Sequence, residues 1–267
     1  MKFVRYLHGG RRQTGIVLDG MIHMADTDLK QVIAGERRLE SVRIADAKLK
    51  ETEIALLPCV PEGGKIICVG LNYKKHADEA GLPVPQTPIL FNKFANALAA
   101  HGEVVTLSAA ATQYDYEAEL GVVIGKRAKN VSREQALHHV FGYCNVNDLS
   151  ARDLQNRTSQ WMLGKIMDGF CPTGPYLVTA DEVGDPNELS IGLTRNGEAK
   201  QNSNTRDMIF RVDEIIAYVS RYMTLEPGDL LLTGTPEGVG PMRPGDEVSI
   251  TVEGLGTLTN SVVSADE

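Results

Sequence analysis

The sequence predicts an α+β protein that is rich in strands, with a rolled sheet as its main body and a small N-terminal domain. Most of its apolar runs are short and are bounded by glycine, proline or aspartate, as expected for strands joined by turns. Segments with helical character are few. Many strands and few helices favour a β-barrel-like or rolled sheet over a doubly wound α/β fold.

The small N-terminal domain is expected at residues 1–60. The runs "KFVRYL" and "TGIVLDG" alternate like the arms of a hairpin, and "DLKQVIAG" resembles a short helix that ends at Gly35. The stretch "LLPCVPEGG" then places two prolines and two glycines before a new apolar run. We therefore place the domain boundary there and expect the larger domain at residues 61–267.

In the larger domain, apolar runs between turn residues predict strands, and longer amphipathic stretches predict helices. The predicted strands are 66–70, 88–91, 119–124, 174–178, 191–195, 230–233, 247–252 and 256–262. The predicted helices are 73–80, 132–140, 150–156 and 212–223, and Ser132 is the expected N-cap of the second.

Composition excludes several classes of protein. The formal net charge is −8 and no basic stripe is visible, which argues against a nucleic-acid partner. No stretch of about 18 or more apolar residues predicts a membrane span, and "MKFVRYLHGG" lacks the apolar segment of a signal peptide. Without an export signal we expect a cytoplasmic protein. Its four widely spaced cysteines form no CxxC pair and are expected to be reduced, mostly buried thiols: Cys59, Cys68, Cys144 and Cys171.

The segment "YDYEAELGVVIGK" places three acids at alternate positions before an apolar strand. In an extended chain Asp115, Glu117 and Glu119 point to one face, while Tyr114 and Tyr116 point to the other. For this triplet alone, an edge strand with a solvated polar face is the preferred explanation, so the acids by themselves do not identify a site.

A second polar segment, "NDLSARDLQNR", places Asp148 at or near an expected helix start, with Arg152 and Gln155 on the same helical face. Asp148 could simply be an N-cap. Together with two alternate glutamates, however, it would supply three oxygen ligands for a hard divalent cation such as Mg²⁺. The open coordination positions could then hold a bidentate 2-oxo acid.

Taken together, these segments resemble the fumarylacetoacetate hydrolase family. The resemblance covers most of residues 65–256, and its motifs occur in the family's order: "CVGLNYKKHADEAG", "PILFNK", "YDYEAELGVVIGK", "NDLSARDLQ", "LGKIMDGFCPTGPYLV", "RNGEAKQNSNTRDMIF" and "LEPGDLLLTGTPEGVG". It implies that residues 61–267 form a catalytic domain with a rolled mixed β-sheet, that the protein is a homodimer, and that a small N-terminal domain precedes the catalytic one.

The resemblance also implies the roles of individual residues. The family's E-x-E pair and later aspartate bind Mg²⁺, Mn²⁺ or Ca²⁺, which implies Glu117, Glu119 and Asp148 as metal ligands. Residues implied at the substrate are Arg152, Gln155, Thr205 and Thr235 as contacts and Lys165 as a catalytic group.

The segment "NYKKHADEAG" carries His76 and Glu79, which lie one helical turn apart. A neutral histidine of pKa about 6.5 can take a proton from water, and a nearby carboxylate would orient the ring. For this segment by itself, an exposed surface helix would be the preferred explanation. The resemblance instead implies a catalytic His–Glu pair that activates water in family members that cleave C–C bonds.

These residues predict a divalent-metal-dependent hydrolase that cleaves a C–C bond of a 2,4-dioxo acid through an enolate of pyruvate. Decarboxylation of oxaloacetate and isomerisation of a 2-hydroxydienedioate would use the same metal site, so they stay open as alternatives. A catalytically silent metabolite-binding protein is a further alternative. The sequence does not reveal what Asp115 does, and it leaves Glu237 as either a substrate contact or a turn residue.

Overall fold

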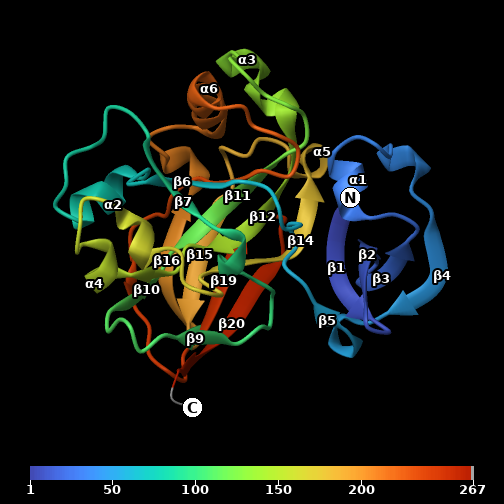
Figure 1. Cartoon of the computed structure of the whole chain (residues 1–267), viewed down its shortest axis with the longest axis horizontal. Helices are drawn as coiled ribbons and strands as arrows, with labels where there is room; N and C mark the ends of the chain where they lie inside the picture. Colours follow the sequence, from blue (N-terminus) through green and yellow to red (C-terminus); the bar gives the residue numbers. More distant parts are fainter. Residues whose placement is uncertain (266–267) are drawn as a thin grey trace.

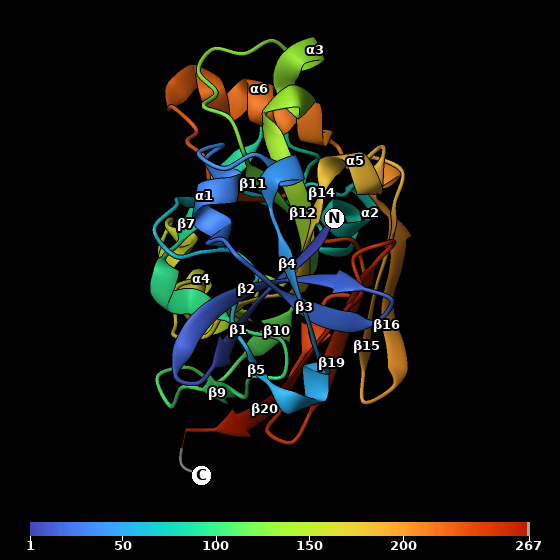
Figure 2. The ribbon, with the colours of Figure 1, turned by 90° about the vertical axis from the view of Figure 1, so that its right-hand side faces the viewer.

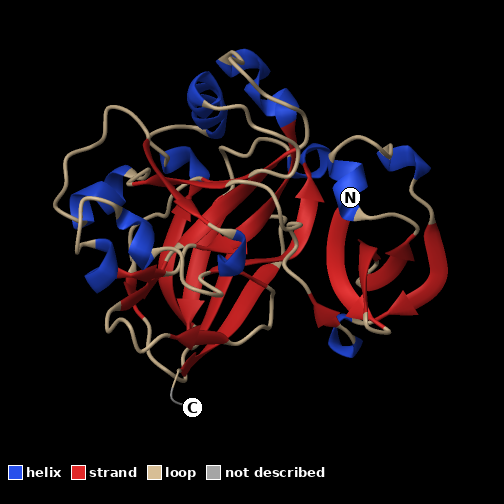
Figure 3. Cartoon of the chain, in the orientation of Figure 1, coloured by secondary structure: helices blue, strands red, loops and turns tan. Residues whose placement is uncertain are grey.

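The computed structural model describes residues 1–265, apart from the side chain of Ala47. It has a large body of sheets and a smaller lobe that holds the first strands and the N-terminus (Figures 1 and 2). Strands fill the centre of the body, and the short helices lie at its periphery (Figure 3). The strand-rich α+β class predicted from the sequence is confirmed.

The main sheet runs through both lobes and, within residues 1–265, has twelve strands. Most neighbours are antiparallel, but β17 pairs with β6 in parallel, so the sheet is mixed as predicted. In spatial order its strands are β4 (Ile44–Leu49), β3 (Met21–Ala25), β2 (Arg11–Leu18), β1 (Lys2–His8), β14 (Cys171–Thr179), β12 (Val140–Asn147), β11 (Ala118–Ile124), β17 (Leu230–Leu232), β6 (Ile66–Gly70) and β7 (Ile89–Lys93), with β5 (Ala55–Leu56) on β1 and β8 (Leu98–Ala99) on β14.

A second sheet packs against the middle of the main sheet, and a third, small sheet carries the strand that leads into the acidic segment. The second sheet is β16 (Glu198–Asn204), β15 (Ser190–Arg195), β19 (Glu247–Val252), β20 (Thr257–Ser264) and β9 (Val105–Leu107). The third is β13 (Ser150–Ala151), β10 (Tyr114–Tyr116) and β18 (Gly240–Pro241). Between the main and second sheets lies the larger hydrophobic core, to which β11, β15 and β19 all contribute.

The helices are short. They are α1 (Leu29–Ile33), α2 (Lys74–Glu79), α3 (Arg133–Ala136), α4 (Arg152–Gln155), α5 (Ala180–Val183) and α6 (Val212–Tyr222). Single 3₁₀ turns occur at Leu39–Ser41, Glu51–Glu53, Ala95–Ala97, Leu137–His139, Trp161–Gly164 and Thr205–Asp207. The longest described helix, α6, has 11 residues, and no helix within residues 1–265 is long and apolar enough to cross a membrane.

All eight strands predicted in the larger domain are present, with shifted ends, and α1 ends before Gly35, whose φ of +72° suits glycine. Two helix predictions are partly wrong. The predicted helix 132–140 is helical only to His139, because Val140 begins β12, and the helix predicted at 150–156 covers only Arg152–Gln155. Ser132 precedes α3 but makes no side-chain hydrogen bond to its backbone.

Strand β12 is central to the fold yet was not predicted, because polar residues interrupt its apolar pattern. Both asparagines concerned are buried and bonded. Asn145 donates to the Gly174 carbonyl at 3.0 Å and accepts from Val252 N at 2.7 Å, while Asn147 accepts from Glu117 N at 3.0 Å. Buried amides with fixed partners are compatible with a central strand, but the sequence does not reveal those partners.

The N-terminal lobe shares structure with the body. Strand β1 pairs with β14, and Phe3, Ile16 and Leu29 belong to the same buried cluster as Val123 and Val146 of the central strands. Division into domains at residue 60 therefore stays a prediction. The four cysteines all lie in this cluster as buried, free thiols, as predicted from their spacing.

Candidate active site

The three acids implied as metal ligands come together in the body. Glu117 lies between β10 and β11, Glu119 lies in β11, and Asp148 follows β12, which pairs with β11. All three are buried, and each offers a carboxylate oxygen within 4.8 Å of the others. Antiparallel pairing produces this proximity, since Asp148 N donates to the Glu117 carbonyl at 2.9 Å.

The surroundings of Asp148 differ from the helix-cap alternative. Helix α4 begins at Arg152 with Ala151 as its N-cap, and β13 separates it from Asp148, so the prediction of one helical face was wrong for this residue. Asp148 is fully buried and lies between two lysines. Lys93 Nζ is 2.7 Å from Oδ1, and Lys165 Nζ is 2.7 Å from Oδ2.

Lys93 was not predicted as a residue of this site. It ends β7, is buried, and donates to three carbonyl oxygens in addition to its ion pair with Asp148. These are Leu149 O at 3.0 Å, Lys165 O at 2.7 Å and Phe170 O at 2.7 Å. The lysine therefore joins the segments on both sides of the acids, and its only signal in the sequence was a charge at the end of the apolar run "PILF".

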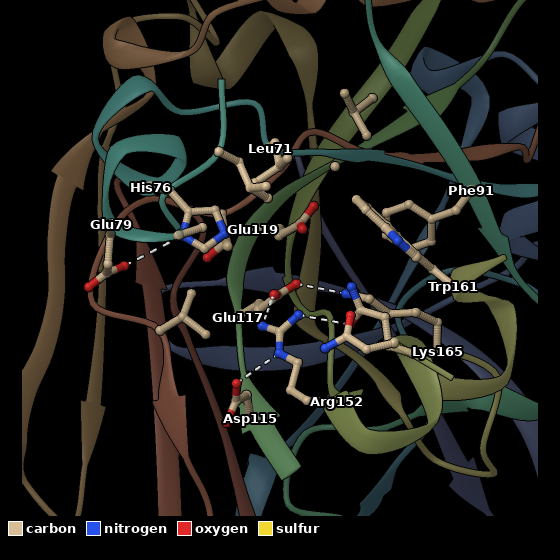
Figure 4. Close-up of a pocket in the computed structure, with 18 residues that line it drawn as sticks. Leu71, His76, Glu79, Phe91, Asp115, Glu117, Glu119, Arg152, Trp161 and Lys165 are labelled. Atoms are coloured by element: carbon tan, nitrogen blue, oxygen red, sulfur yellow. Dashed lines mark hydrogen bonds and ion pairs between the residues drawn. The ribbon is translucent and has the colours of Figure 1, made fainter. Parts of the chain in front are cut away.

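Arg152 forms a second cluster beside the first (Figure 4). Its Nε donates to Asp115 Oδ2 at 2.8 Å and its Nη1 to Gln155 Oε1 at 2.8 Å, while Nη2 contacts Glu117 Oε1. Asp115, whose role the sequence does not reveal, therefore fixes the guanidinium of Arg152 that faces Glu117. Arg152 and Gln155 do share one face of α4, as predicted.

The electrostatics distinguish the two glutamates. Burial alone would raise the pKa of Glu117, but the positive charges of Arg152 and Lys165 outweigh it and hold that pKa well below its usual range. Burial raises the pKa of Glu119 well above its usual range, and the charges of Asp148 and Glu117 raise it further. Among the ion pairs of residues 1–265 none involves Glu119, whose Oε2 accepts instead from Gly234 N at 2.7 Å.

These residues fit a hard divalent cation. Three carboxylates with oxygen donors match the preference of Mg²⁺ and Mn²⁺. The repulsion that raises the pKa of Glu119 is what a cation beside Glu117, Glu119 and Asp148 would relieve. Lys165 already lies between two of these acids, 2.8 Å from Glu117 Oε2, and they raise its pKa against the effect of burial.

His76 and Glu79 lie on α2, and Figure 4 shows His76 pointing toward Glu117 and Glu119. The His76 side chain is 13% exposed and the Glu79 side chain 46%, so the pair reaches from the cavity to solvent. His76 Nδ1 is 3.5 Å from Glu79 Oε2, a contact that makes no hydrogen bond and becomes an ion pair only when the ring is protonated. Glu79 Oε2 also accepts from Gly238 N at 3.1 Å, which ties α2 to the loop before β18.

The remaining implied residues divide into two groups. Gln155, Thr235 and Lys165 line the same cavity as His76 and the two glutamates. Thr205 does not: it is fully buried in a 3₁₀ turn after β16, and its Oγ1 accepts from Leu189 N at 2.8 Å. In this structure its hydroxyl oxygen is bonded to the Leu189 backbone.

Glu237 forms an ion pair with Lys75 of α2, the helix that carries His76 and Glu79. Its Oε1 lies 3.4 Å from Lys75 Nζ on α2, and Glu237 is not among the described residues that line the cavity. Together with the contact between Glu79 and Gly238, this pair makes two polar links between α2 and the 237–238 turn. Of the two alternatives for Glu237, the structure favours a turn residue.

The cavity has a volume of about 440 Å³, and Leu71, Phe91 and Trp161 form an apolar wall of it (Figure 4). Leu71 has a φ of +52°, a left-handed conformation that costs a non-glycine residue about 1–2 kcal/mol. Its neighbour Asn72 holds the turn, donating to Thr233 O at 2.7 Å and Phe210 O at 2.9 Å. Strain of this kind often marks functional sites.

Known proteins resemble this chain over most of its length. It is 45% identical over 242 residues to a mitochondrial oxaloacetate tautomerase of Bos taurus, covering 86% of this chain and 77% of the relative. It is 42% identical over 283 residues to 2,4-didehydro-3-deoxy-L-rhamnonate hydrolase of Sphingomonas sp. (strain SKA58), covering 98% and 96%. A solved structure of maleylpyruvate hydrolase from Sphingobium sp. SYK-6, with manganese and pyruvate, covers 99% of both chains with a TM-score of 0.82 and 32% identity.

These relatives are enzymes whose names describe acidic small-molecule substrates. The family model described as fumarylacetoacetate (FAA) hydrolase C-terminal matches residues 65–263, which include every residue of the candidate site. The chain therefore belongs to the fumarylacetoacetate hydrolase family.

Proposed function

We propose that this protein is a divalent-metal-dependent hydrolase that cleaves the C–C bond between the methylene carbon and the distal carbonyl of a 2,4-dioxo acid. Glu117, Glu119 and Asp148 would hold Mg²⁺ or Mn²⁺. When bound, the ion would polarise the 2-oxo group of the substrate and offset negative charge that develops there. The relative whose structure contains manganese and pyruvate supports this choice of metal and product.

Arg152 and Lys165 supply the positive charge that a carboxylate substrate needs. Both line the cavity, and both now contact the acids, Arg152 through Glu117 and Lys165 through Glu117 and Asp148. Asp115 fixes the plane of the guanidinium, and each of its two Nη atoms keeps one N–H that a substrate carboxylate could use. Gln155 and Thr235 add neutral polar contacts beside them.

The observation that carries the proposal is the place of the His76–Glu79 pair. The ring of His76 is largely buried and faces the acids across the cavity, while Glu79 lies behind it. In this arrangement His76 takes a proton from water, and Glu79 stabilises the charged ring. The distance of 3.5 Å is compatible with this role, since such contacts are often long before substrate binds.

The resulting reaction is balanced. The water oxygen forms a bond to the distal carbonyl carbon, the adjacent C–C bond breaks, and its electron pair moves onto the methylene carbon as the enolate of pyruvate. His76 returns its proton to that carbon. The products are a carboxylic acid and pyruvate, and the fixed positive charges of Arg152 and Lys165 favour the enolate electrostatically.

A second candidate is the keto–enol tautomerisation of oxaloacetate, which the 45% identity to an oxaloacetate tautomerase favours. That reaction needs proton transfer but no attacking water. The acids and Arg152 cannot distinguish the two reactions, because both pass through an enolate.

The deciding experiment measures pyruvate release from acylpyruvates and tautomerisation of oxaloacetate, with chelator-treated protein before and after addition of Mg²⁺ or Mn²⁺. We expect metal-dependent cleavage of an acylpyruvate that His76→Ala lowers by about a hundredfold or more. His138→Ala, an exposed histidine outside the cavity, is the control. Turnover of oxaloacetate alone would reject the hydrolase, and binding without any turnover would indicate a catalytically silent protein.

A further inference from the structure

The cavity is chemically divided. Its acidic and basic side chains come from residues 115–119 of the β10–β11 segment, from α2 and α4, and from Lys165 after the 3₁₀ turn Trp161–Gly164, whereas the wall by β6 and β7 is apolar. Lys165 marks the border, since its Nζ lies 4.8 Å from the centre of the Phe91 ring. A substrate with its 2-oxo acid group among the charges would therefore extend its other end along the apolar wall.

The apolar wall is built around one indole ring. The Phe91 and Trp161 ring centres are 5.6 Å apart, and the Trp161 ring lies directly on the backbone of Gly70. A Cβ added at Gly70 would lie 2.3 Å from Trp161 Cζ3, so only glycine leaves the indole in this position. Trp161 is also the only tryptophan of the chain.

Beyond Trp161 the cavity continues into a groove of about 610 Å³, with which it shares Leu71, Leu82 and Trp161. The rest of the groove is formed by the segment between α2 and β7 and by Ile89, the first residue of β7. None of its described lining residues is charged: Leu71, Leu82, Pro83, Val84, Pro85, Gln86, Thr87, Ile89 and Trp161. Leu82 and Val84 are 46% and 42% exposed, so apolar surface faces solvent along the groove.

We infer, on the basis of the proposed function, that the substrate carries an uncharged, mainly apolar acyl substituent, which lies across Phe91 and Trp161 and enters this groove. An apolar substituent would remove Leu71, Leu82 and Trp161 from water, which is favourable. A substituent ending in a carboxylate would lose water around its charge and meet no cation among the groove residues of the described chain. The groove therefore selects against substrates that carry a second, distal carboxylate.

The first test measures binding by the fluorescence of Trp161, with Mg²⁺ present, and needs no turnover. The probes are 2-oxo acids with methyl, propyl and pentyl chains, which lack the second carbonyl and cannot be cleaved. We expect the Kd to fall about fourfold for each added methylene. An analogue with a carboxylate at the end of the longest chain should bind at least about tenfold more weakly than its neutral counterpart. Equal affinities along the series, or tighter binding of the dicarboxylate, would overturn the inference.

A pair of leucine variants tests the groove directly. Leu82→Arg places a cation in it and should reverse the preference, so that the dicarboxylate binds more tightly than the neutral acid. Leu18→Arg is the matched control, because Leu18 is 43% exposed and lies in the N-terminal lobe, and it should leave the preference as it was. Identical behaviour of the two variants would contradict the placement of the substituent.

Gly70→Ala provides an independent test of the aromatic wall, since the added methyl group displaces the indole. We expect it to reduce the dependence of Kd on chain length to less than about twofold per methylene. Acylpyruvates with the same substituents are assayed for cleavage in parallel. If Kd depends on chain length but no acylpyruvate is cleaved, the proposed hydrolase is rejected and the inference about the groove stands. If acylpyruvates are cleaved at rates that do not depend on the substituent, the inference about the groove is rejected and the proposed hydrolase stands.

Discussion

The two polar sides of the cavity are built differently. On the side of β11 and β12 the acids are buried and their ion pairs are short, with both lysine contacts to Asp148 at 2.7 Å. On the side of α2 the His76–Glu79 contact is 3.5 Å, Glu79 is half exposed, and the helix has six residues. Buried ion pairs thus hold the acidic side, whereas the polar contacts of α2 are longer and more exposed, and we expect α2 to adjust more readily to a substrate.

The largest effect is expected at Asp148, which is the shared partner of two buried lysines. Asp148→Asn removes its charge and leaves Lys93 and Lys165 without full compensation, so the free energy of unfolding should fall by about 3–5 kcal/mol. Urea denaturation measures it. The exposed control Asp46→Asn should change stability by less than about 0.5 kcal/mol.

If Asp148→Asn is too unstable to purify, Lys93→Met in the same chain should recover part of the loss, because it removes one of the uncompensated charges. A loss below about 1 kcal/mol in the single variant would mean that the acidic side is no more rigid than α2. The comparison between the two sides would then fail.

The second effect is stabilisation by metal. Mn²⁺ at about a hundred times its Kd should raise the free energy of unfolding by about 2.7 kcal/mol, because the ion binds the folded acids and not the unfolded chain. Glu117→Gln should lose most of this increase, and the exposed control Glu36→Gln should keep it. Thermal unfolding is measured for each variant with and without Mn²⁺. Any stability lost with the ion pairs of Glu117 is present in both measurements and cancels in their difference.

The third effect concerns α2 and should alter activity rather than stability. Glu79→Gln keeps the size of the side chain and its bond from Gly238 but removes the charge that supports a protonated His76. We expect kcat for acylpyruvate cleavage to fall about tenfold, which is about 1.4 kcal/mol, with the urea midpoint unchanged. A clear loss of stability with kcat preserved would make Glu79 a structural residue.

Much of this site could be predicted from the sequence because its signals are local. Alternation in an extended chain is enough to place Asp115, Glu117 and Glu119 on one side, and a turn of helix is enough to pair Arg152 with Gln155. The order of the family's motifs linked these segments to Asp148, which local spacing had misplaced on a helix.

What could not be predicted depends on partners far away in the sequence. Lys93 is 55 positions from Asp148, so nothing near it distinguishes a buried ion pair from a surface lysine. Strand β12 has the same difficulty, since Asn145 is acceptable in its core only because Gly174 and Val252 complete its hydrogen bonds. Thr205 is a third case: its motif implied a substrate contact, which stays a prediction, and nothing near it in the sequence reveals that its hydroxyl accepts from Leu189 N.

The smallest effect is expected at Lys75 and Glu237, the ion pair that links α2 to the 237–238 turn. Lys75 is 67% exposed, so the pair should contribute less than about 1 kcal/mol to stability in a double-mutant cycle of Lys75→Met and Glu237→Gln. If α2 adjusts to substrate, breaking this ion pair should raise KM for acylpyruvates by a few-fold in each single variant. The double variant should have about the same KM as each single one, because either substitution already removes the pair. The same helix carries His76, so kcat should fall as well only if the ion pair between Lys75 and Glu237 also positions the His76 ring. A coupling energy above about 2 kcal/mol would show that α2 is as firmly held as the acidic side, and the contrast between them would have to be abandoned.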